Sequence, residues 1–414
     1  MPATHDGVLW FALRLVAGAA GALTFVIARP CCWEASWSPW PGPLRRPSAS
    51  ASRTTSPRRP RPPDLTPQGA PMSTLLTGLG IDRPILAAPM AGGPSTPALV
   101  AAVARAGGLG FLAAGYKSGQ ALAGQIHAVE AEGVPFGVNL FVPNPVPISP
   151  EEYGRYAREL REEADRYGVT LPDAAPTDDD DRWWEKIELL KVHPVPWVSF
   201  TFGIPDRDVI TSLRRVGTTV LQGVTTADEA RRAADAGADA LIVQALAAGG
   251  HSFTLTPDRP LAATALSDLV AEVRRATALP TVATGGIGTP TDVADALRAG
   301  ADAAMVGTAL LRTDESGACA PHKAALADPA FDSTVLTRAF TGRPARALRN
   351  HFTDQYSDRA PAGYPGLHHL TSGLRQAATA AGDTRLIHLW AGTGYREART
   401  EPASRTIDRL TSRL

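Results

Sequence analysis

Cysteine is scarce in this sequence. Only Cys31, Cys32 and Cys319 occur among the 414 residues. Three cysteines are too few for a disulfide framework, and their spacing does not match the ligands of a zinc site. The sequence therefore predicts a protein that folds without disulfides and without a zinc site. We expect it in the reducing cytoplasm.

The sequence also lacks an excess of charge of either sign. It contains 41 basic and 41 acidic side chains. Nucleic acids and anionic membranes attract basic proteins, so a balanced chain gives no electrostatic reason to expect either partner for its folded part. Hydrophobic residues make up 44% of the chain, enough for a sizeable core. The oligomeric state does not follow from the sequence.

Residues 1–71 lack the pattern of a folded domain. Residues 9–28 are apolar apart from Arg14, and the stretch up to residue 71 is rich in Pro, Ser and Arg. About 20 apolar residues could span a bilayer or act as an export signal. The other interpretation is a disordered or mis-extended leader before a start at Met72. We favour the leader, and assign the folded domain to residues 72–414.

Beyond residue 84, short apolar runs alternate with helical patterns. Continuous apolar runs are typical of parallel strands buried on both faces. The segments between them often begin with Ser, Thr or Asp and end with Gly, as helices do. The predicted strands are residues 85–90, 108–114, 136–141, 197–202, 218–224, 238–245, 280–286 and 301–310.

Eight strand–helix units predict an α/β fold, the TIM (β/α)8 barrel, with an insertion after strand three and a C-terminal helical segment. A doubly wound sheet is the alternative. The insertion covers residues 142–196. Because it leaves the C-terminal end of strand three, we interpret it as a candidate lid over the barrel mouth. Its acidic run, residues 178–181, is expected to be a solvated loop.

Glycines and polar residues gather at the C-terminal ends of the predicted strands, where barrel active sites form. The glycines of TGGIG (284–288) and VGT (306–308) each precede a helix. Such loops can hold a phosphate through backbone N–H groups. Asn139 and Gln244 are amides at strand ends. They either bind a planar heterocycle or are polar residues satisfied near the barrel rim.

His251 is the only histidine at one of these strand ends. It follows Gly249 and Gly250, which would let substrate and cofactor approach closely. Its ordinary pKa of about 6.5 suits proton abstraction, although a lone histidine can also be structural. No nucleophilic Ser or Cys pairs with it, so we set aside a hydrolase triad. The C-terminal segments, whose place the patterns leave open, hold His322, His368, His369 and His388.

Six segments together resemble the nitronate monooxygenases, the FMN enzymes once called 2-nitropropane dioxygenases. In chain order they read APMAGG, GVNLF, VSFTFG, QALAAGGH, ATGGIG and MVGTAL. The resemblance covers about residues 74–412 and includes YPGLHHLTSGLR and LWAGTGY. It implies FMN as cofactor and a nitroalkane or alkyl nitronate and O2 as substrates. The implied products are a carbonyl compound and nitrite, and the implied cycle needs no nicotinamide cofactor.

The resemblance also implies roles for single residues. Met90 and Asn139 would contact the flavin, and Gln244 and Gly249 would lie along its ring and ribityl chain. His251 would be the base that removes the α-proton of the nitroalkane. The phosphate end of FMN would be held by Gly285, Gly286, Met305, Val306, Gly307 and Thr308.

The sequence departs from the family in the strand-six motif. Ala245 and Ala247 stand where the family often has the Gly and Glu of QGxEAGGH, and Ser252 and Phe253 follow His251. Loss of the Glu removes a charge near the expected base. Flavin binding is still expected, but the substrate is left open.

Three other functions remain. One is an NAD(P)H-dependent flavin reductase, such as an enoyl reductase, on the same barrel. Another is a flavin-binding protein without turnover, in which His251 is structural. The last is a lyase or isomerase that binds a sugar phosphate. Such enzymes usually place a catalytic lysine at a strand end, and none of the predicted strand ends has one.

Overall fold

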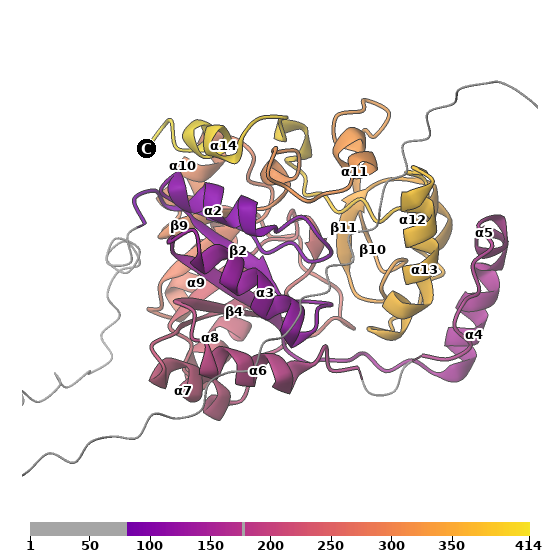
Figure 1. Cartoon of the computed structure of the whole chain (residues 1–414), viewed down its shortest axis with the longest axis horizontal. Coiled ribbons are helices and arrows are strands. Elements are labelled where there is room, and N and C mark those ends of the chain that lie inside the picture. The colour runs from indigo at the N-terminus through magenta and orange to yellow at the C-terminus, as the bar shows by residue number, and fades with distance from the viewer. Residues whose placement is uncertain (1–80, 176–178) are drawn as a thin grey trace, which may run out of the picture. The chain divides into compact units, whose positions relative to one another are not determined.

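The computed structural model describes residues 81–175 and 179–414, so the whole predicted leader, residues 1–71, lies outside the described residues. Eight parallel strands form a closed barrel, which confirms the predicted TIM barrel (Figure 1). Pairing of Ile85 with Ala304 joins the first strand to the last. The barrel strands are β1 (Ile85–Ala87), β2 (Leu109–Ala113), β3 (Phe136–Phe141), β4 (Trp197–Thr201), β5 (Thr219–Val224), β6 (Ala240–Gln244), β8 (Thr281–Thr284) and β9 (Ala303–Val306).

Helices cover the outside of the barrel. Several begin at a Ser or Thr whose side chain caps the first turn, as Thr96, Ser118 and Thr226 do, so the predicted start signals are confirmed. The last helix returns from far along the chain to pack against the first and seventh, and so takes the eighth position. The barrel helices are α2 (Pro97–Arg105), α3 (Gly119–Glu130), α6 (Trp183–Val192), α7 (Arg207–Arg215), α8 (Ala227–Ala236), α9 (Leu266–Ala276), α10 (Pro290–Arg298) and α14 (Ala403–Leu410).

Large apolar side chains fill the interior of the barrel. Phe111, Trp197 and Leu221 are fully buried there in one cluster. Glycine makes room for them. A Cβ atom on Gly137 would lie 2.3 Å from the Phe111 ring. The barrel is therefore a packed core rather than a channel, and only its C-terminal rim is open to a ligand.

Two excursions from the barrel pack together over one side of it. We call them the capping layer, residues 142–175 and 311–395. One excursion leaves between β3 and α6, the other between β9 and α14, and both contribute to one apolar cluster that contains Tyr156 and Leu370. Figure 1 shows α4 and α5 beside α13. The capping helices are α4 (Pro150–Glu159), α5 (Arg161–Arg166), α11 (Ala320–Ala325), α12 (His351–Tyr356) and α13 (Gly366–Ala380), with the 3-10 turns η1 (Thr308–Leu310) and η2 (Tyr395–Glu397) at its borders.

The C-terminal segment also contains strands that the sequence analysis missed. β10 (Thr334–Thr337), β11 (Ala345–Leu348) and β7 (Gly250–His251) form a small antiparallel sheet. β7 has only two residues, which is too short for a periodic pattern to reveal. Its pairing with β11 fixes the backbone of His251 against the capping layer.

The acidic run is only in part the solvated loop that the sequence predicts: Asp179 and Asp180 are exposed and lie in a loop, Asp178 lies outside the described residues, and Asp181 is largely buried. Asp181 forms an ion pair of 2.8 Å with the buried Lys186 and accepts a hydrogen bond from the backbone N–H of Tyr116. Asp179 lies 2.6 Å from Nε2 of His369 on α13. The run therefore ties the start of α6 to the capping layer. Charge patterns alone did not show these partners because they are distant in sequence.

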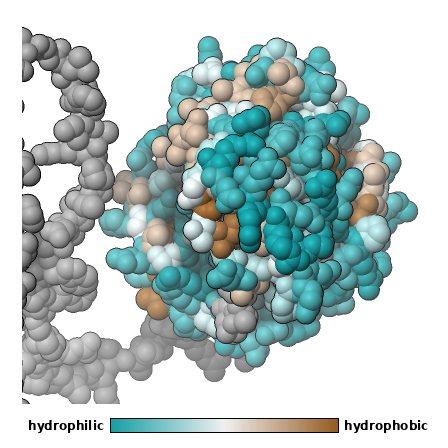
Figure 2. Space-filling view, turned by 90° about the vertical axis from the view of Figure 1, so that its right-hand side faces the viewer, coloured by the Kyte–Doolittle hydropathy of each residue, from teal (hydrophilic) through white to brown (hydrophobic). Residues whose placement is uncertain are grey.

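The outer face of the capping layer is mostly hydrophilic (Figure 2). Apolar side chains of α4 and α13, such as Tyr153 and Leu374, turn inward to the shared cluster instead. Among the helices within residues 81–175 and 179–414, none has the length and apolar character to cross a membrane.

The close packing of β2 on α2 predicts a large effect of one methyl group. A Cβ atom on Gly110 would lie 2.6 Å from Cα and 2.7 Å from the carbonyl oxygen of Val100. Backbone atoms cannot rotate away, so Gly110→Ala should destabilise the fold by about 1–3 kcal/mol or more. We expect a lower thermal unfolding midpoint than for the wild type.

Gly124→Ala is the matched control, because nothing lies within 4 Å of the added methyl group on α3. Alanine favours helix over glycine by about 0.5–1 kcal/mol, so this variant should unfold at a slightly higher temperature. Equal midpoints for the two variants would contradict the packing argument.

Candidate active site

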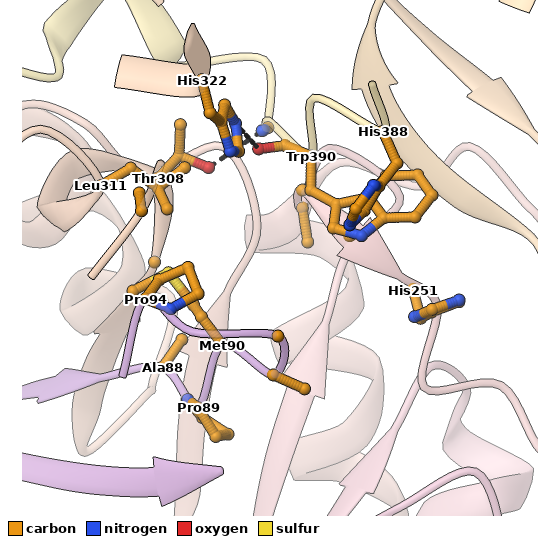
Figure 3. Close-up of a pocket in the computed structure, with 18 of the residues that line it drawn as sticks. Ala88, Pro89, Met90, Pro94, His251, Thr308, Leu311, His322, His388 and Trp390 are labelled. Atoms are coloured by element: carbon orange, nitrogen blue, oxygen red, sulfur yellow. Dashed lines mark hydrogen bonds between the residues drawn. The ribbon is translucent and has the colours of Figure 1, made fainter. Parts of the chain in front are cut away.

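A cavity of about 670 Å³ lies between the barrel mouth and the capping layer. Its volume falls in the range of about 300–1,000 Å³ that is typical of small-molecule sites. Figure 3 shows Met90 and Pro94 on one side of it and His388, Trp390 and His251 on the other. Every site residue predicted from the sequence lines this one cavity: Met90, Asn139, Gln244, Gly249, His251, Gly285, Gly286, Met305, Val306, Gly307 and Thr308.

One end of the cavity is lined by free backbone donors. Within the described chain, the N–H groups of Gly286, Gly307 and Thr308 have no hydrogen-bond acceptor. Gly286 has φ +79°, a conformation that suits glycine. Converging N–H groups form a concavity that binds an anion. The loops after β8 and β9 therefore present free backbone donors at the place where the sequence analysis expects a phosphate to bind.

The N-terminus of α10 contributes less to this site than expected. The carboxylate of Asp292 accepts hydrogen bonds from the N–H groups of Gly288 and Thr289, at 3.0 and 2.8 Å. Asp292 and Thr289 also form a capping box. The amides that open the helix are thus already occupied by a side chain, so an anion would rely on the loop amides before them.

A loop of the capping layer, residues 390–394, closes this end of the cavity. The Gly392 N–H donates to Oγ1 of Thr308 at 3.0 Å, and the Thr393 N–H donates to the carbonyl of Ala247 at 3.0 Å. A Cβ atom on Gly249 would lie 2.5 Å from the Gly392 nitrogen. Gly249 therefore permits the approach of two backbones. The sequence analysis had explained it by the approach of a cofactor.

The two strand-end amides differ in what they leave free. Nδ2 of Asn139 donates to the side chains of Ser199 and Thr201, at 3.0 and 2.9 Å. Its Oδ1 atom therefore remains as the acceptor for a ligand. Gln244 instead holds the next turn of the chain, because Nε2 donates to the His251 carbonyl and Oε1 accepts from the Phe253 N–H. Gln244 mainly positions His251.

His251 lies at the other end of the cavity. Its Nε2 atom is 2.9 Å from Oγ1 of Thr341, and its ring packs against Phe202 and Trp390. Burial lowers the pKa of His251 to about 3, with smaller contributions from the positive charges of Arg343 and Arg375. The ring is therefore neutral near pH 7 and has a lone pair that can accept a proton, but a pKa this low also makes it a weaker base than an ordinary histidine.

The sequence analysis missed most of the groups opposite the barrel rim. Tyr116, Trp390 and Arg375 line the cavity, and the rings of Tyr116 and His368 stack at 4.2 Å. Trp390, Arg375 and His368 lie in the capping layer, far from any barrel strand in the sequence. The motifs YPGLHHLTSGLR and LWAGTGY contain or border them, so the resemblance held a signal for their position but not for their roles.

Four histidines share this cavity, and we call them the histidine cluster: His251, His322, His368 and His388. Burial is the main cause that lowers the pKa of His322 to about 4 and of His368 to about 2. It also holds the pKa of His388 well below its usual value. His322 bonds to the carbonyl of Trp390 at 3.0 Å (Figure 3). The whole cluster is neutral near pH 7.

The chain is similar to known proteins over most of its length. The family model for nitronate monooxygenase matches residues 73–412. A probable nitronate monooxygenase of Staphylococcus saprophyticus is 35% identical over 332 residues, which cover 78% of this chain and 93% of the relative. The nitronate monooxygenase of Paraburkholderia phytofirmans is 36% identical over 350 residues, covering 82% and 94%.

Two solved structures are similar over most of the chain. The nitroalkane oxidase of Streptomyces ansochromogenes has a TM-score of 0.77 at 49% identity, covering 82% of this chain and 97% of that one. FabK of Thermotoga maritima has a TM-score of 0.64 at 27% identity, covering 83% and 95%.

The histidine cluster predicts a loss of stability in mild acid. A histidine in an unfolded chain titrates near about pH 6.5, whereas the folded cluster stays neutral to lower pH. Stability should therefore be full above about pH 6.5 and fall as the pH drops toward 4, by up to about 1.4 kcal/mol per pH unit for each histidine. The thermal unfolding midpoint between about pH 7.5 and 4.5 measures this.

His388→Gln should flatten this pH dependence, because one buried proton acceptor is removed. His127→Gln, on the exposed side of α3, should leave the dependence unchanged. If the two variants gave the same slope as the wild type, the cluster would not be the source of the acid sensitivity.

Proposed function

The chain belongs to the nitronate monooxygenase family, and we propose that it is an FMN-dependent nitronate monooxygenase. Membership of the family makes it a flavin-dependent oxidoreductase that acts on small molecules. In our proposal it oxidises nitroalkanes or alkyl nitronates with O2 to a carbonyl compound and nitrite. One observation carries this proposal: a neutral, buried histidine faces the same cavity as a set of free backbone donors.

The cavity fits FMN in the chemistry of its wall. Gly286, Gly307 and Thr308 would bind the phosphate through their N–H groups, and Oδ1 of Asn139 would accept from the flavin ring. Met90, which lies across the cavity from His251, would contact the flavin. When bound, flavin would supply the chemistry that takes up electrons from the nitronate and passes them to O2. The protein would hold the substrate beside it and exclude water.

The hydrogen bonds around His251 support one of its two ring nitrogens as the basic atom. The Thr341 hydroxyl has one hydrogen, and the carbonyl of Arg343, 3.3 Å away, can only accept it. When that bond forms, Oγ1 accepts from Nε2–H of His251, at 2.9 Å. The lone pair then lies on Nδ1. We assign Nδ1 as the atom that takes the α-proton of a nitroalkane.

The first test is a pair of measurements on the purified full chain. We expect the absorbance bands of oxidised flavin, FMN on release of the cofactor, and nitrite from 1-nitropropane in air without NAD(P)H. Flavin with NAD(P)H oxidation but no nitrite would favour the reductase. Flavin with neither activity would favour a binding protein. A protein that stays colourless after FMN is added would exclude all three.

His251→Gln tests the base. Loss of a general base typically lowers the rate about 10²–10⁴-fold, and we expect this fall in kcat/KM for neutral 1-nitropropane. With the preformed nitronate, which has already lost its proton, the variant should keep activity within a few fold of the wild type. Flavin content should not change.

Thr341→Val is the matched variant for orientation. It removes the hydrogen bond to His251 but keeps the ring, so activity on the neutral substrate should fall less than in His251→Gln. Full activity of His251→Gln on 1-nitropropane would show that another group removes the proton.

A further inference from the structure

We infer that Arg375 is the anion-binding residue of the substrate site, and that it holds the two oxygens of the nitronate group. This inference rests on the proposed function, because it takes a nitronate as the substrate. Arg375 lies in the middle of α13, is only 6% exposed, and lines the cavity. Sequence patterns did not single it out.

Neutral groups hold the guanidinium of Arg375 in place. Nε donates to Oγ1 of Thr371 and Nη2 donates to the carbonyl of His368, both at 3.0 Å. Nη1 lies 3.4 Å from the ring of His388. These partners orient the fork of the side chain, but none carries a negative charge that would neutralise it.

The charge of Arg375 therefore has no counter-ion among residues 81–175 and 179–414. No carboxylate forms an ion pair with it there. The buried lysine Lys186, by contrast, is paired with Asp181. A buried charge without a partner is costly, and it persists where a ligand supplies the opposite charge. His368 and His388 do not compete for that ligand, because burial lowers the pKa of each and keeps its ring neutral.

Arg343, the other buried arginine near His251, does not fill this role. Its Nη2 donates to the carbonyl of Thr254 at 2.6 Å, and its guanidinium lies 4.0 Å from the centre of the Phe202 ring. It does not line the cavity. Arg375 is therefore the arginine that can reach a ligand beside His251.

The geometry of the substrate places its oxygens near the base. The carbon that loses its proton is bonded directly to the nitro nitrogen, so a group that serves the oxygens must lie close to His251. Nη1 of Arg375 lies 3.4 Å from the ring of His388. The Trp390 ring packs against the rings of both His388 and His251, with centroids 5.3 and 5.4 Å away. A planar guanidinium matches two oxygens on one planar centre, as it does in carboxylates.

The charge on the substrate grows as the reaction proceeds. In the neutral nitroalkane the nitro group carries no net charge. When its α-proton moves to His251, the electron pair of the broken C–H bond forms a C=N π bond, and the N–O π pair that it displaces moves onto oxygen, so the two oxygens share the negative charge. Arg375 then binds more strongly than before, so it would stabilise the transition state for proton removal as well as the bound nitronate.

Butanoate is the probe for this site, because its carboxylate has the charge and planar shape of a nitronate. Its binding to the flavin-loaded enzyme can be followed by isothermal titration calorimetry. We expect Arg375→Gln to raise the Kd of butanoate about 10- to 100-fold, the size of a lost charge-assisted hydrogen bond. Arg375→Lys keeps the positive charge but loses the planar pair of donors. Its Kd for butanoate should therefore lie between those of Arg375→Gln and the wild type.

Two controls isolate the charge. Butanamide has a similar shape but is neutral, so its affinity should be the same in all variants. Arg312→Gln is the matched variant, because Arg312 is half-buried and, like Arg375, donates to a carbonyl, that of Ala398, but does not line the cavity. It should bind butanoate as the wild type does.

Steady-state kinetics link the site to the reaction. With preformed propyl-1-nitronate, Arg375→Gln should raise KM about 10-fold or more and change kcat less. With neutral 1-nitropropane, the same variant should lower kcat, because the charge forms in the transition state.

Each outcome decides a different question. Equal butanoate affinity in the wild type and in both Arg375 variants would overturn the inference. Weaker butanoate binding with an unchanged KM for the nitronate would also overturn it, since the anion bound there would not be the reacting group. A third outcome is a wild type that releases no nitrite while Arg375→Gln still binds butanoate more weakly than the wild type does. In that case the proposed function fails and the anion site of Arg375 stands.

Discussion

The buried guanidinium of Arg343 holds the two layers of this protein together. It has no exposed surface, and it donates to the carbonyls of Thr254, after β6, and Asn144, after β3. It also lies over the ring of Phe202, whose φ of +79° is unusual for a residue with a side chain. Thr341, two residues before it, bonds to His251. The position of the candidate base therefore depends on one cation bound by the loops of three strands.

The same contacts give the cavity an unusual electrostatic character. Arg343 and Arg375 are buried without carboxylate partners among the described residues, and the histidines around them are neutral. Ala247 is uncharged, so the turn after β6 adds no negative charge. Buried cations lower the pKa of nearby imidazoles and attract anions. A neutral base next to a site that favours negative charge suits the conversion of a neutral acid into its anion.

The barrel and the capping layer contribute different kinds of groups to the cavity. The barrel loops after β8 and β9 present free backbone donors, such as the N–H of Gly307, which suit any phosphate-bearing cofactor. The capping layer contributes Trp390 and Arg375, which line the cavity opposite the barrel rim. The chain is similar over most of its length to a nitroalkane oxidase and also to FabK. Fold alone does not fix function, so the reaction must be sought in the groups that the capping layer adds.

The sequence by itself determined the barrel and the positions on its rim. Continuous apolar runs and helix caps are local signals, and the C-terminal ends of parallel strands must meet at one face, so residues such as Asn139 and Gly286 could be placed at the site without coordinates. Tertiary structure alone decided what they face. Arg375 and His388 lie more than 120 residues after His251, and no local pattern records their approach. Their roles come from burial, which sets charge and pKa only after distant segments have packed together.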